Sequence, residues 1–268
     1  MPRRGAPLVA RLQVVARAFE GRGALDTAAS RALLEAVARG ERPETLRLYR
    51  PDDVVAFSTT DAHRDGFAAA LRAARGAGFD AALRLAGGTA ALFQRETLAF
   101  GWCRAEPDPR AGIRARFEAM SALVARALRR LGVDARVGEV PGAWCPGDSS
   151  VNAGGRRKLM GVGQRVVRGA AWTGGVIMVG GSARSRAVLA PVYAALGLAY
   201  DPATTGSVAD EIGEVPVEVV RDALLAEIAA EREITAADFD DALLAEAARI
   251  EPLQRADAQP DRDAAQRG

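Results

Sequence analysis

The spacing of apolar residues predicts an alternation of strands and helices along most of the chain. Alternating apolar positions predict a first strand over Leu8–Val15, and a helical spacing follows over Asp26–Arg39. Two β segments, Thr45–Tyr49 and Val54–Ser58, are separated by a Pro-Asp-Asp turn. This turn chemistry predicts that the two segments form a hairpin.

The middle of the chain continues the same alternation. Paired glycines at Gly87-Gly88 predict a turn between two strands, and glycines that interrupt the later apolar runs indicate sharp bends beside a ligand cleft. Pro109 is suited to the first turn of a long helix. The predicted elements are a helix over Phe67–Arg75, strands over Ala82–Leu85 and Ala90–Trp102, a helix from Pro109 to Leu131, a strand over Val133–Val137 and strands within Asp148–Val179.

The C-terminal part has a different pattern. Two helices are predicted, Val217–Ala230 and Ala236–Ile250, the second with Thr235 as its N-cap. The last residues are polar and show no periodicity, which is typical of a frayed tail. We therefore divide the chain into an α/β domain at 1–205, a helical appendage at 206–253 and a flexible tail at 254–268.

Composition excludes several functional classes. The 36 basic and 34 acidic residues nearly balance, so neither a nucleic-acid partner nor a membrane surface is indicated, and no apolar run is long enough to span a bilayer. Two cysteines, Cys103 and Cys145, form no disulfide framework or metal motif, which favours a cytoplasmic protein without a bound metal. The single histidine, His63, is predicted in a solvated turn.

Lys158 is the only lysine among the 36 basic residues, and glycines surround it in the segment 154–163. Lysine is a compact point charge on a flexible stem, whereas arginine is a broad planar fork. A lysine flanked by glycines therefore suggests chemistry on a carboxylate, a phosphate or an acyl carbonyl. The alternative is a solvated hairpin residue without a function.

Several motifs occur in an order that resembles one known family. They are Ala24-Leu25-Asp26 with Ala32-Leu33-Leu34, Leu46-Arg47-Leu48-Tyr49, the turn Arg84-x-x-Gly87-Gly88, and Gly155-x-x-Lys158-x-x-Gly161-x-x-Gln164. Over residues 8–200 the chain resembles the catalytic domain of the lipoate–protein ligase A family, which is related to biotin ligases and octanoyltransferases. The resemblance implies an α/β (α+β) fold with a mixed, largely antiparallel sheet flanked by helices.

The same resemblance implies an activity. Ligases of this family activate lipoate or octanoate with ATP and Mg²⁺ to an acyl-adenylate, then pass the acyl group to a lysine of a lipoyl carrier domain, in a 2-oxoacid dehydrogenase E2 or the glycine cleavage H protein. Lys158 would be the catalytic residue that stabilises negative charge in the transition state. The implied substrate- or nucleotide-binding residues are Arg84, Gly87, Gly88, Thr89, Gly155, Gly161, Gln164 and Asp148.

Cys145 supports a second mechanism. It precedes Pro146-Gly147-Asp148 at the place where cysteine-dependent octanoyltransferases of the superfamily carry their acyl-accepting thiol. Such an enzyme would take the acyl group from an acyl carrier protein thioester and would need no ATP. A small buried thiol beneath Trp144 is the alternative for Cys145, and Cys103 is predicted as a packing residue.

A third reading is a noncatalytic member that only binds its ligand. Phe93 stands where ligases commonly have His, Thr89 replaces a glycine of the turn, and Ala171-Trp172-Thr173-Gly174 replaces a His-His-Gly segment. The turn Ser58-Thr59-Thr60 also lacks the usual Gly-Arg. These changes remove polar groups from the predicted acyl and nucleotide pockets.

Overall fold

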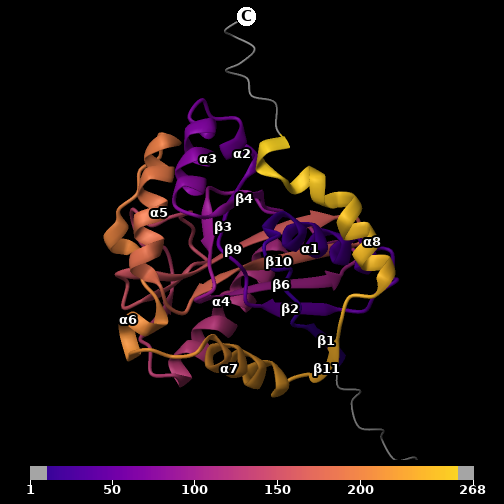
Figure 1. The fold of residues 1–268 in the computed structure, drawn as a ribbon. Helices are drawn as coiled ribbons and strands as arrows, with labels where there is room; N and C mark the ends of the chain where they lie inside the picture. The colour runs from indigo at the N-terminus through magenta and orange to yellow at the C-terminus, as the bar shows by residue number, and fades with distance from the viewer. Residues whose placement is uncertain (1–10, 259–268) are drawn as a thin grey trace, which may run out of the picture.

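The computed structural model describes residues 11–258, and residues 1–10 and 259–268 lie outside the described part (Figure 1). Its strands form an eight-stranded sheet in the order β11-β1-β2-β6-β10-β9-β8-β7 and a three-stranded sheet in the order β4-β3-β5. The strands are β1 (Arg11–Val15), β2 (Thr45–Tyr49), β3 (Val54–Phe57), β4 (Asp80–Leu83), β5 (Ala91–Phe93), β6 (Thr97–Ala105), β7 (Ala135–Val137), β8 (Val151–Ala153), β9 (Arg157–Val167), β10 (Ala170–Met178) and β11 (Glu233–Ala237).

The large sheet is mixed, as the resemblance predicted. β1 runs parallel to both β11 and β2, while the pairings from β2 through β6, β10, β9 and β8 to β7 are antiparallel. The helices around the sheets are α1 (Gly23–Ala38), α2 (Thr59–Ala62), α3 (Phe67–Gly76), α4 (Ile113–Arg130), α5 (Ser182–Ala195), α6 (Val208–Ile212), α7 (Val217–Ala229) and α8 (Asp241–Ile250). The expected α/β class is thus confirmed. No helix in the described part is both long enough and apolar enough to cross a bilayer.

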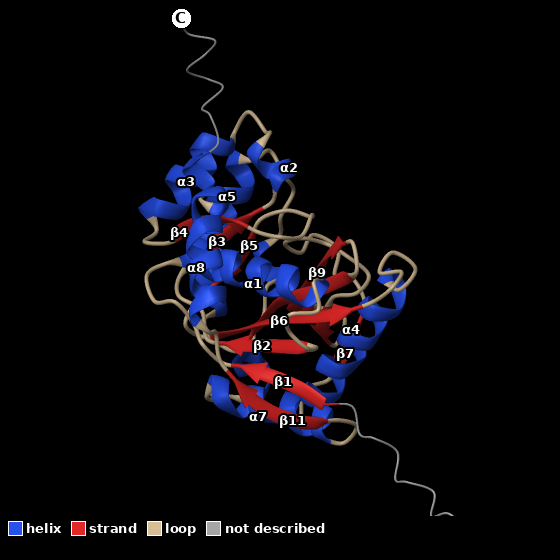
Figure 2. Cartoon of the chain, turned by 90° about the vertical axis from the view of Figure 1, so that its right-hand side faces the viewer, coloured by secondary structure: helices blue, strands red, loops and turns tan. Residues whose placement is uncertain are grey.

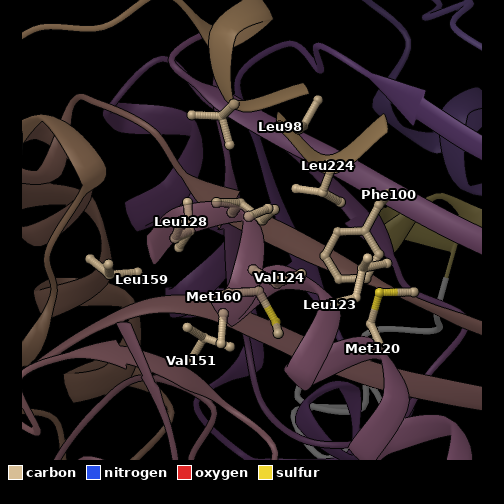
Figure 3. Close-up of a cluster of buried hydrophobic side chains, with 14 of the residues drawn as sticks. Leu98, Phe100, Met120, Leu123, Val124, Leu128, Val151, Leu159, Met160 and Leu224 are labelled. Carbon is tan, nitrogen blue, oxygen red and sulfur yellow. The ribbon is translucent and has the colours of Figure 1, made fainter. Parts of the chain in front are cut away.

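Helices cover both faces of the large sheet. On one face, apolar side chains of α4 and α7 pack against the sheet in a core that includes Phe100, Val124 and Met160 (Figure 3). On the other face, α1 packs against the sheet and α8 packs on α1. Twelve of the residues of α1 are buried, because this helix lies between the sheet, α8 and β4. Helix α1 therefore forms a fixed wall beside the functional site.

The small sheet lies at one end of the large sheet together with α2, α3 and α5 (Figure 2). A second core joins β3, β4 and β5 to α3 and α5 and extends to Trp144, Val176 and Tyr193. Helix α5 was not predicted from the sequence. It brings Tyr193 from the C-terminal half of the chain into the neighbourhood of the glycine turn.

Two predicted strand arrangements are wrong. The segments Thr45–Tyr49 and Val54–Ser58 do not form a hairpin, because β2 pairs with β1 and β6 in the large sheet while β3 belongs to the small one. The predicted strand Ala90–Trp102 is two strands, β5 and β6, divided at a tight turn in which the Thr97 N–H donates to the Gln94 carbonyl. As a result, the glycine turn joins β4 and β5, which flank β3 without pairing with each other.

Other element boundaries also differ from the predictions. The long helix begins at Ile113 rather than at Pro109. Thr235, predicted as an N-cap, and the first two residues of the helix predicted over Ala236–Ile250 lie in strand β11 at the edge of the large sheet, and α8 is capped by Asp240 instead. The region 206–253 is therefore not purely helical. Two 3-10 turns, Glu251–Gln254 and Ala256–Ala258, order the start of the predicted tail, whose remainder lies outside the described residues.

The predicted solvated turn and the predicted packing cysteine are both confirmed. His63 is exposed at the end of α2. Cys103 is completely buried in β6, and this burial raises the pKa of its thiol. Cys103 therefore offers no reactive thiolate.

Candidate active site

Cys145 lies in the loop between β7 and β8 in an unusual backbone conformation. Its φ of 41° is in the left-handed region, and within residues 11–258 no other non-glycine residue has a positive φ. Such a conformation costs on the order of 1 kcal/mol in a residue with a side chain, so the surrounding structure must hold it in place. The thiol itself is half-buried, whereas the preceding Trp144 is buried.

Lys158 holds this loop from the sheet side. Its Nζ donates to the carbonyl oxygens of Trp144, at 3.0 Å, and Cys145, at 2.6 Å, and lies 4.4 Å from the centre of the Trp144 ring. The residue is only 1% exposed. A Cβ on Gly161 would lie 2.8 Å from that ring, so this glycine leaves room for the indole. The single lysine is therefore a buried site residue and not a solvated hairpin residue.

The glycine turn closes over the thiol from the small sheet. Arg84 donates to the Gly87 carbonyl and places its Nη2 3.2 Å from Cys145 Sγ. Gly88 has a φ of +96°, and a Cβ there would meet the Arg84 guanidinium and would lie 2.8 Å from Cys145 Sγ. Only glycine provides both this backbone conformation and this close approach. The turn and the cysteine loop are thus in direct contact.

These neighbours change the acidity of both reactive groups. Burial by itself would raise the pKa of the Cys145 thiol, but the charges of Arg84 and Lys158 and the backbone amide of Thr89 outweigh it and lower that pKa below its usual value. Burial lowers the pKa of Lys158 to about 8. The neighbouring charges therefore stabilise the thiolate form of Cys145 relative to an ordinary cysteine.

Tyr193 is a site residue that the sequence did not reveal. Its hydroxyl accepts a hydrogen bond from the Cys145 N–H at 2.7 Å, donates to the Ala90 carbonyl at 2.7 Å and lies 2.9 Å from Thr89 Oγ1. No motif distinguishes this tyrosine, and its helix α5 was itself missed. An apolar helical spacing over 182–195 was the only available signal.

Arg84 also lines an apolar cavity. It lies between α1, the small sheet and the strands β2, β6 and β10, and its lining includes Phe93, Phe100, Trp172, Leu85 and Arg84. The Trp172 indole lies across β6 and β10 and packs on one glycine of each strand. A Cβ at either glycine would overlap the ring. Phe93, which stands where the family pattern has His, and Trp172, from the segment that replaces His-His-Gly, thus both line this cavity.

Three of the predicted binding residues do not contact the Cys145 thiol. Gly155, with a φ of +76°, forms the β8–β9 turn, and its N–H donates to Asn152 Oδ1. Gly161 leaves room for the Trp144 ring, as described above. Asp148 is exposed in the loop three residues after Cys145. The structure assigns none of these three residues a contact with the thiol.

Gln164 lies on the opposite face of β9. Side chains alternate along a strand, and the Cβ position of Gly163 faces Ala86 of the glycine turn at 2.6 Å, so Gln164 points toward α4. There its Oε1 accepts from Arg116 Nε at 2.9 Å and its Nε2 donates to the Ile113 carbonyl at 2.7 Å. Gln164 therefore holds the beginning of α4, and the structure gives it no contact with the thiol.

The site combines a thiol of lowered pKa, two cations and an apolar cavity. Within residues 11–258 no three His, Cys, Asp or Glu side chains gather into a group that could hold a metal ion. A thiolate attacks activated carbonyl carbons, and an apolar cavity beside it can hold an aliphatic chain. The arrangement is suited to covalent transfer of an acyl group.

Comparison with known proteins identifies relatives of this chain. The model of the lipoyl protein ligase A/B catalytic domain matches residues 23–248. An octanoyl-[GcvH]:protein N-octanoyltransferase of Geobacillus kaustophilus (strain HTA426) is 30% identical over 166 residues, which are 62% of this chain and 58% of the relative. The chain thus spans little more than half the length of this curated relative.

Two solved structures have a similar fold. A lipoate-protein ligase A bound with ATP superposes with a TM-score of 0.74 at 22% identity, over 90% of this chain and 94% of that one. A bipartite lipoate protein ligase of Thermoplasma acidophilum, described with its E2 lipoyl domain, gives a TM-score of 0.68 at 21% identity, over 90% and 91% of the two chains. At these identities the likeness shows the fold.

Proposed function

Because the chain belongs to the lipoyl protein ligase A/B catalytic-domain family, we propose that it transfers an octanoyl group to a lysine of a lipoyl carrier domain through a thioester on Cys145. One observation carries this proposal. The thiol of Cys145 lies 3.2 Å from the Arg84 guanidinium, in surroundings that lower its pKa. Covalent acyl transfer through a cysteine uses its thiolate as the nucleophile. The name of the Geobacillus relative, an octanoyltransferase, supports the same choice.

The proposed reaction consists of two acyl transfers. In the first, the Cys145 thiolate attacks the carbonyl carbon of an octanoyl–lysine amide on an H protein, the C–N bond breaks, and the lysine amine leaves after taking up a proton. In the second, the deprotonated amine of the acceptor lysine attacks the thioester, the C–S bond breaks, the new amide nitrogen loses a proton, and the thiolate returns. One amide is exchanged for another, so ATP is not required.

Arg84 and Lys158 have separate roles in this proposal. Arg84 stabilises the thiolate before the attack. Its Nε is buried without a protein hydrogen-bond partner among residues 11–258, and the residue lines the apolar cavity, so we propose that its guanidinium binds an oxygen of the acyl donor. Lys158 uses two of its three N–H groups on loop carbonyls, and its charge stabilises the negative charge that develops on the attacked carbonyl.

The cavity supplies the binding energy for the aliphatic chain. Its aromatic walls, Phe93 and Trp172, are suited to an octanoyl chain, and burial of each CH₂ contributes about 0.8 kcal/mol. The polar groups that the family pattern would place at two of these positions are absent from this chain. Octanoate, without polar groups along its length, therefore fits this cavity better than a polar acyl chain.

The H protein and the E2 lipoyl domain are the proposed partners. The relative's name contains GcvH, and the Thermoplasma ligase is described with an E2 lipoyl domain. The reaction needs Cys145 in its reduced form, and both cysteines are free thiols. We infer a reducing compartment such as the cytoplasm.

Intact-mass spectrometry tests the proposal with three acyl sources. The protein is incubated with octanoyl-H protein, with octanoyl-acyl carrier protein, or with octanoate, ATP and Mg²⁺, each followed by an apo lipoyl domain. We expect an octanoyl adduct on Cys145 from octanoyl-H protein without ATP, and its passage to the lipoyl domain. Cys145→Ser should abolish both products, whereas Cys103→Ala should leave both.

The other outcomes distinguish the remaining mechanisms. An adduct formed only from octanoyl-acyl carrier protein would keep the role of Cys145 and change the donor. Transfer that requires ATP and persists in Cys145→Ser would contradict the thioester mechanism and favour the acyl-adenylate route predicted from the sequence. Binding of octanoate without any acylated carrier would indicate a noncatalytic member of the family.

A further inference from the structure

Tyr193 joins three backbone segments that are far apart in the sequence. It projects from α5 and is 1% exposed. Its hydroxyl contacts Cys145 in the β7–β8 loop and both Thr89 and Ala90, which directly follow the glycine turn. No other hydroxyl group in the described part contacts both of these loops.

The hydrogen-bonding capacity of this hydroxyl is completely used. A tyrosine hydroxyl has one donor and can accept two hydrogen bonds. The donor goes to the Ala90 carbonyl at 2.7 Å, so Thr89 Oγ1, at 2.9 Å, and the Cys145 N–H, at 2.7 Å, are the two donors to it. Burial raises the pKa of Tyr193, so the hydroxyl keeps its proton. The group is therefore a fixed three-way junction and not an acid or a base.

Cys145 is held on both sides by this arrangement. Its N–H is bound by Tyr193, and its carbonyl, together with that of Trp144, is bound by Lys158. A residue with a φ of 41° keeps this strained conformation only where surrounding contacts hold it. A relaxed loop would move Sγ away from the Arg84 guanidinium and the Thr89 amide, the groups that lower the pKa of the thiol.

We propose that Tyr193 is a positioning residue that keeps the Cys145 thiol against Arg84 and the glycine turn. This inference deepens the proposed transferase mechanism, on which its effect on turnover rests. Its effect on the thiol does not depend on any acyl donor. The positioning role of Tyr193 and the proposed transferase activity can therefore be tested separately.

The test measures alkylation of Cys145 by iodoacetamide as a function of pH, with peptide-level mass spectrometry to separate Cys145 from the buried Cys103. Tyr193→Phe keeps the ring and removes the hydroxyl. We expect the midpoint of the alkylation profile to move to higher pH and the rate at pH 7 to fall about fivefold, the effect of one ordinary hydrogen bond. The turnover number for octanoyl transfer should fall while KM for the donor stays the same.

Tyr200→Phe is the matched control. The Tyr200 ring lies 5.0 Å from that of Tyr193, but its hydroxyl bonds to Thr205 Oγ1 at 2.6 Å, so its removal should leave the alkylation midpoint unchanged. Thr89→Val, which removes one partner of the junction, should shift the midpoint in the same direction by a smaller amount and provides a second test if Tyr193→Phe does not fold.

Three results would overturn the inference. They are an unchanged midpoint in a folded Tyr193→Phe protein, an equal shift in Tyr200→Phe, and an unchanged midpoint in Thr89→Val when Tyr193→Phe cannot be isolated. A shifted midpoint in a protein that transfers no octanoyl group would support the positioning role and contradict the proposed function.

Discussion

Replacement of Lys158 by methionine should separate stability from activity. Methionine keeps most of the aliphatic stem and removes the ammonium group. At pH 7 the buried amine costs the folded state free energy, because its pKa falls from 10.5 to about 8, which corresponds to about 3 kcal/mol. Against this, the carbonyls of Trp144 and Cys145 lose their donor, at about 1–3 kcal/mol each. The two effects nearly cancel, so we expect the free energy of unfolding to change by less than about 3 kcal/mol.

Activity should respond very differently to the same substitution. Lys158 holds the cysteine loop and lowers the pKa of the thiol, and in the proposed mechanism it also stabilises charge on the attacked carbonyl. Loss of one preorganised electrostatic contact typically lowers turnover by about two to three orders of magnitude. We therefore expect Lys158→Met to form the Cys145 thioester about 10²- to 10³-fold more slowly. Urea unfolding and single-turnover acylation followed by intact mass provide the two measurements.

The pH dependence of stability provides an internal check. An unfolded lysine keeps its proton up to about pH 10.5, whereas the folded protein releases it near pH 8. Between these values the unfolded chain binds more protons, so the stability of the wild type should rise with pH relative to that of Lys158→Met. An unchanged acylation rate in the variant, or parallel stability curves from pH 8 to 10.5, would refute the reasoning.

Three further substitutions test separate parts of the site. Gly88→Ala places a Cβ against Cys145 Sγ at a positive φ, so thioester formation should fall at least about 100-fold while circular dichroism shows a retained fold. Gln164→Leu removes an acceptor from the buried Arg116, which should lower the free energy of unfolding by about 1–3 kcal/mol in urea without changing the rate of octanoyl transfer. Trp172→Leu widens the cavity, so competition assays should show the decanoyl-to-octanoyl ratio of transfer rates rising about tenfold, as expected from two additional buried CH₂ groups.

Elements with strong local signals were predictable from the sequence. The helix at 26–39 and the glycine-interrupted strands within 148–179 agree with α1 and with β8 to β10 apart from their ends. The pairing of strands was not predictable in the same way. β2 and β3 are joined by a turn that is typical of a hairpin, yet β2 pairs with β6, about fifty residues later in the chain. Local turn chemistry carries no information about such distant partners.

The segment 233–237 shows the same limit for secondary structure. Its composition, Glu-Ile-Thr-Ala-Ala, suits the start of a helix, and Thr235 resembled an N-cap. The segment is a strand because β1 offers it a parallel edge at the other end of the chain. Tertiary pairing here overrides local propensity. A chain region that looked like an appendage thus completes the large sheet.

Arg84, Cys145 and Lys158 were each named from the sequence, but the contacts between them and with Tyr193 were not predictable from it. Lys158 and the glycine turn stood out by rarity and by motif, but both are compatible with an adenylate site as well as with a thiol site. What separates the two mechanisms is the charge around Cys145. Arg84, sixty-one residues earlier, lies in contact with its sulfur, and Tyr193, forty-eight residues later, fixes its backbone. A buried thiol without these neighbours would have a raised pKa and would be inert, as Cys103 is. The proposed covalent mechanism therefore depends on contacts that form only when the two sheets and α5 come together.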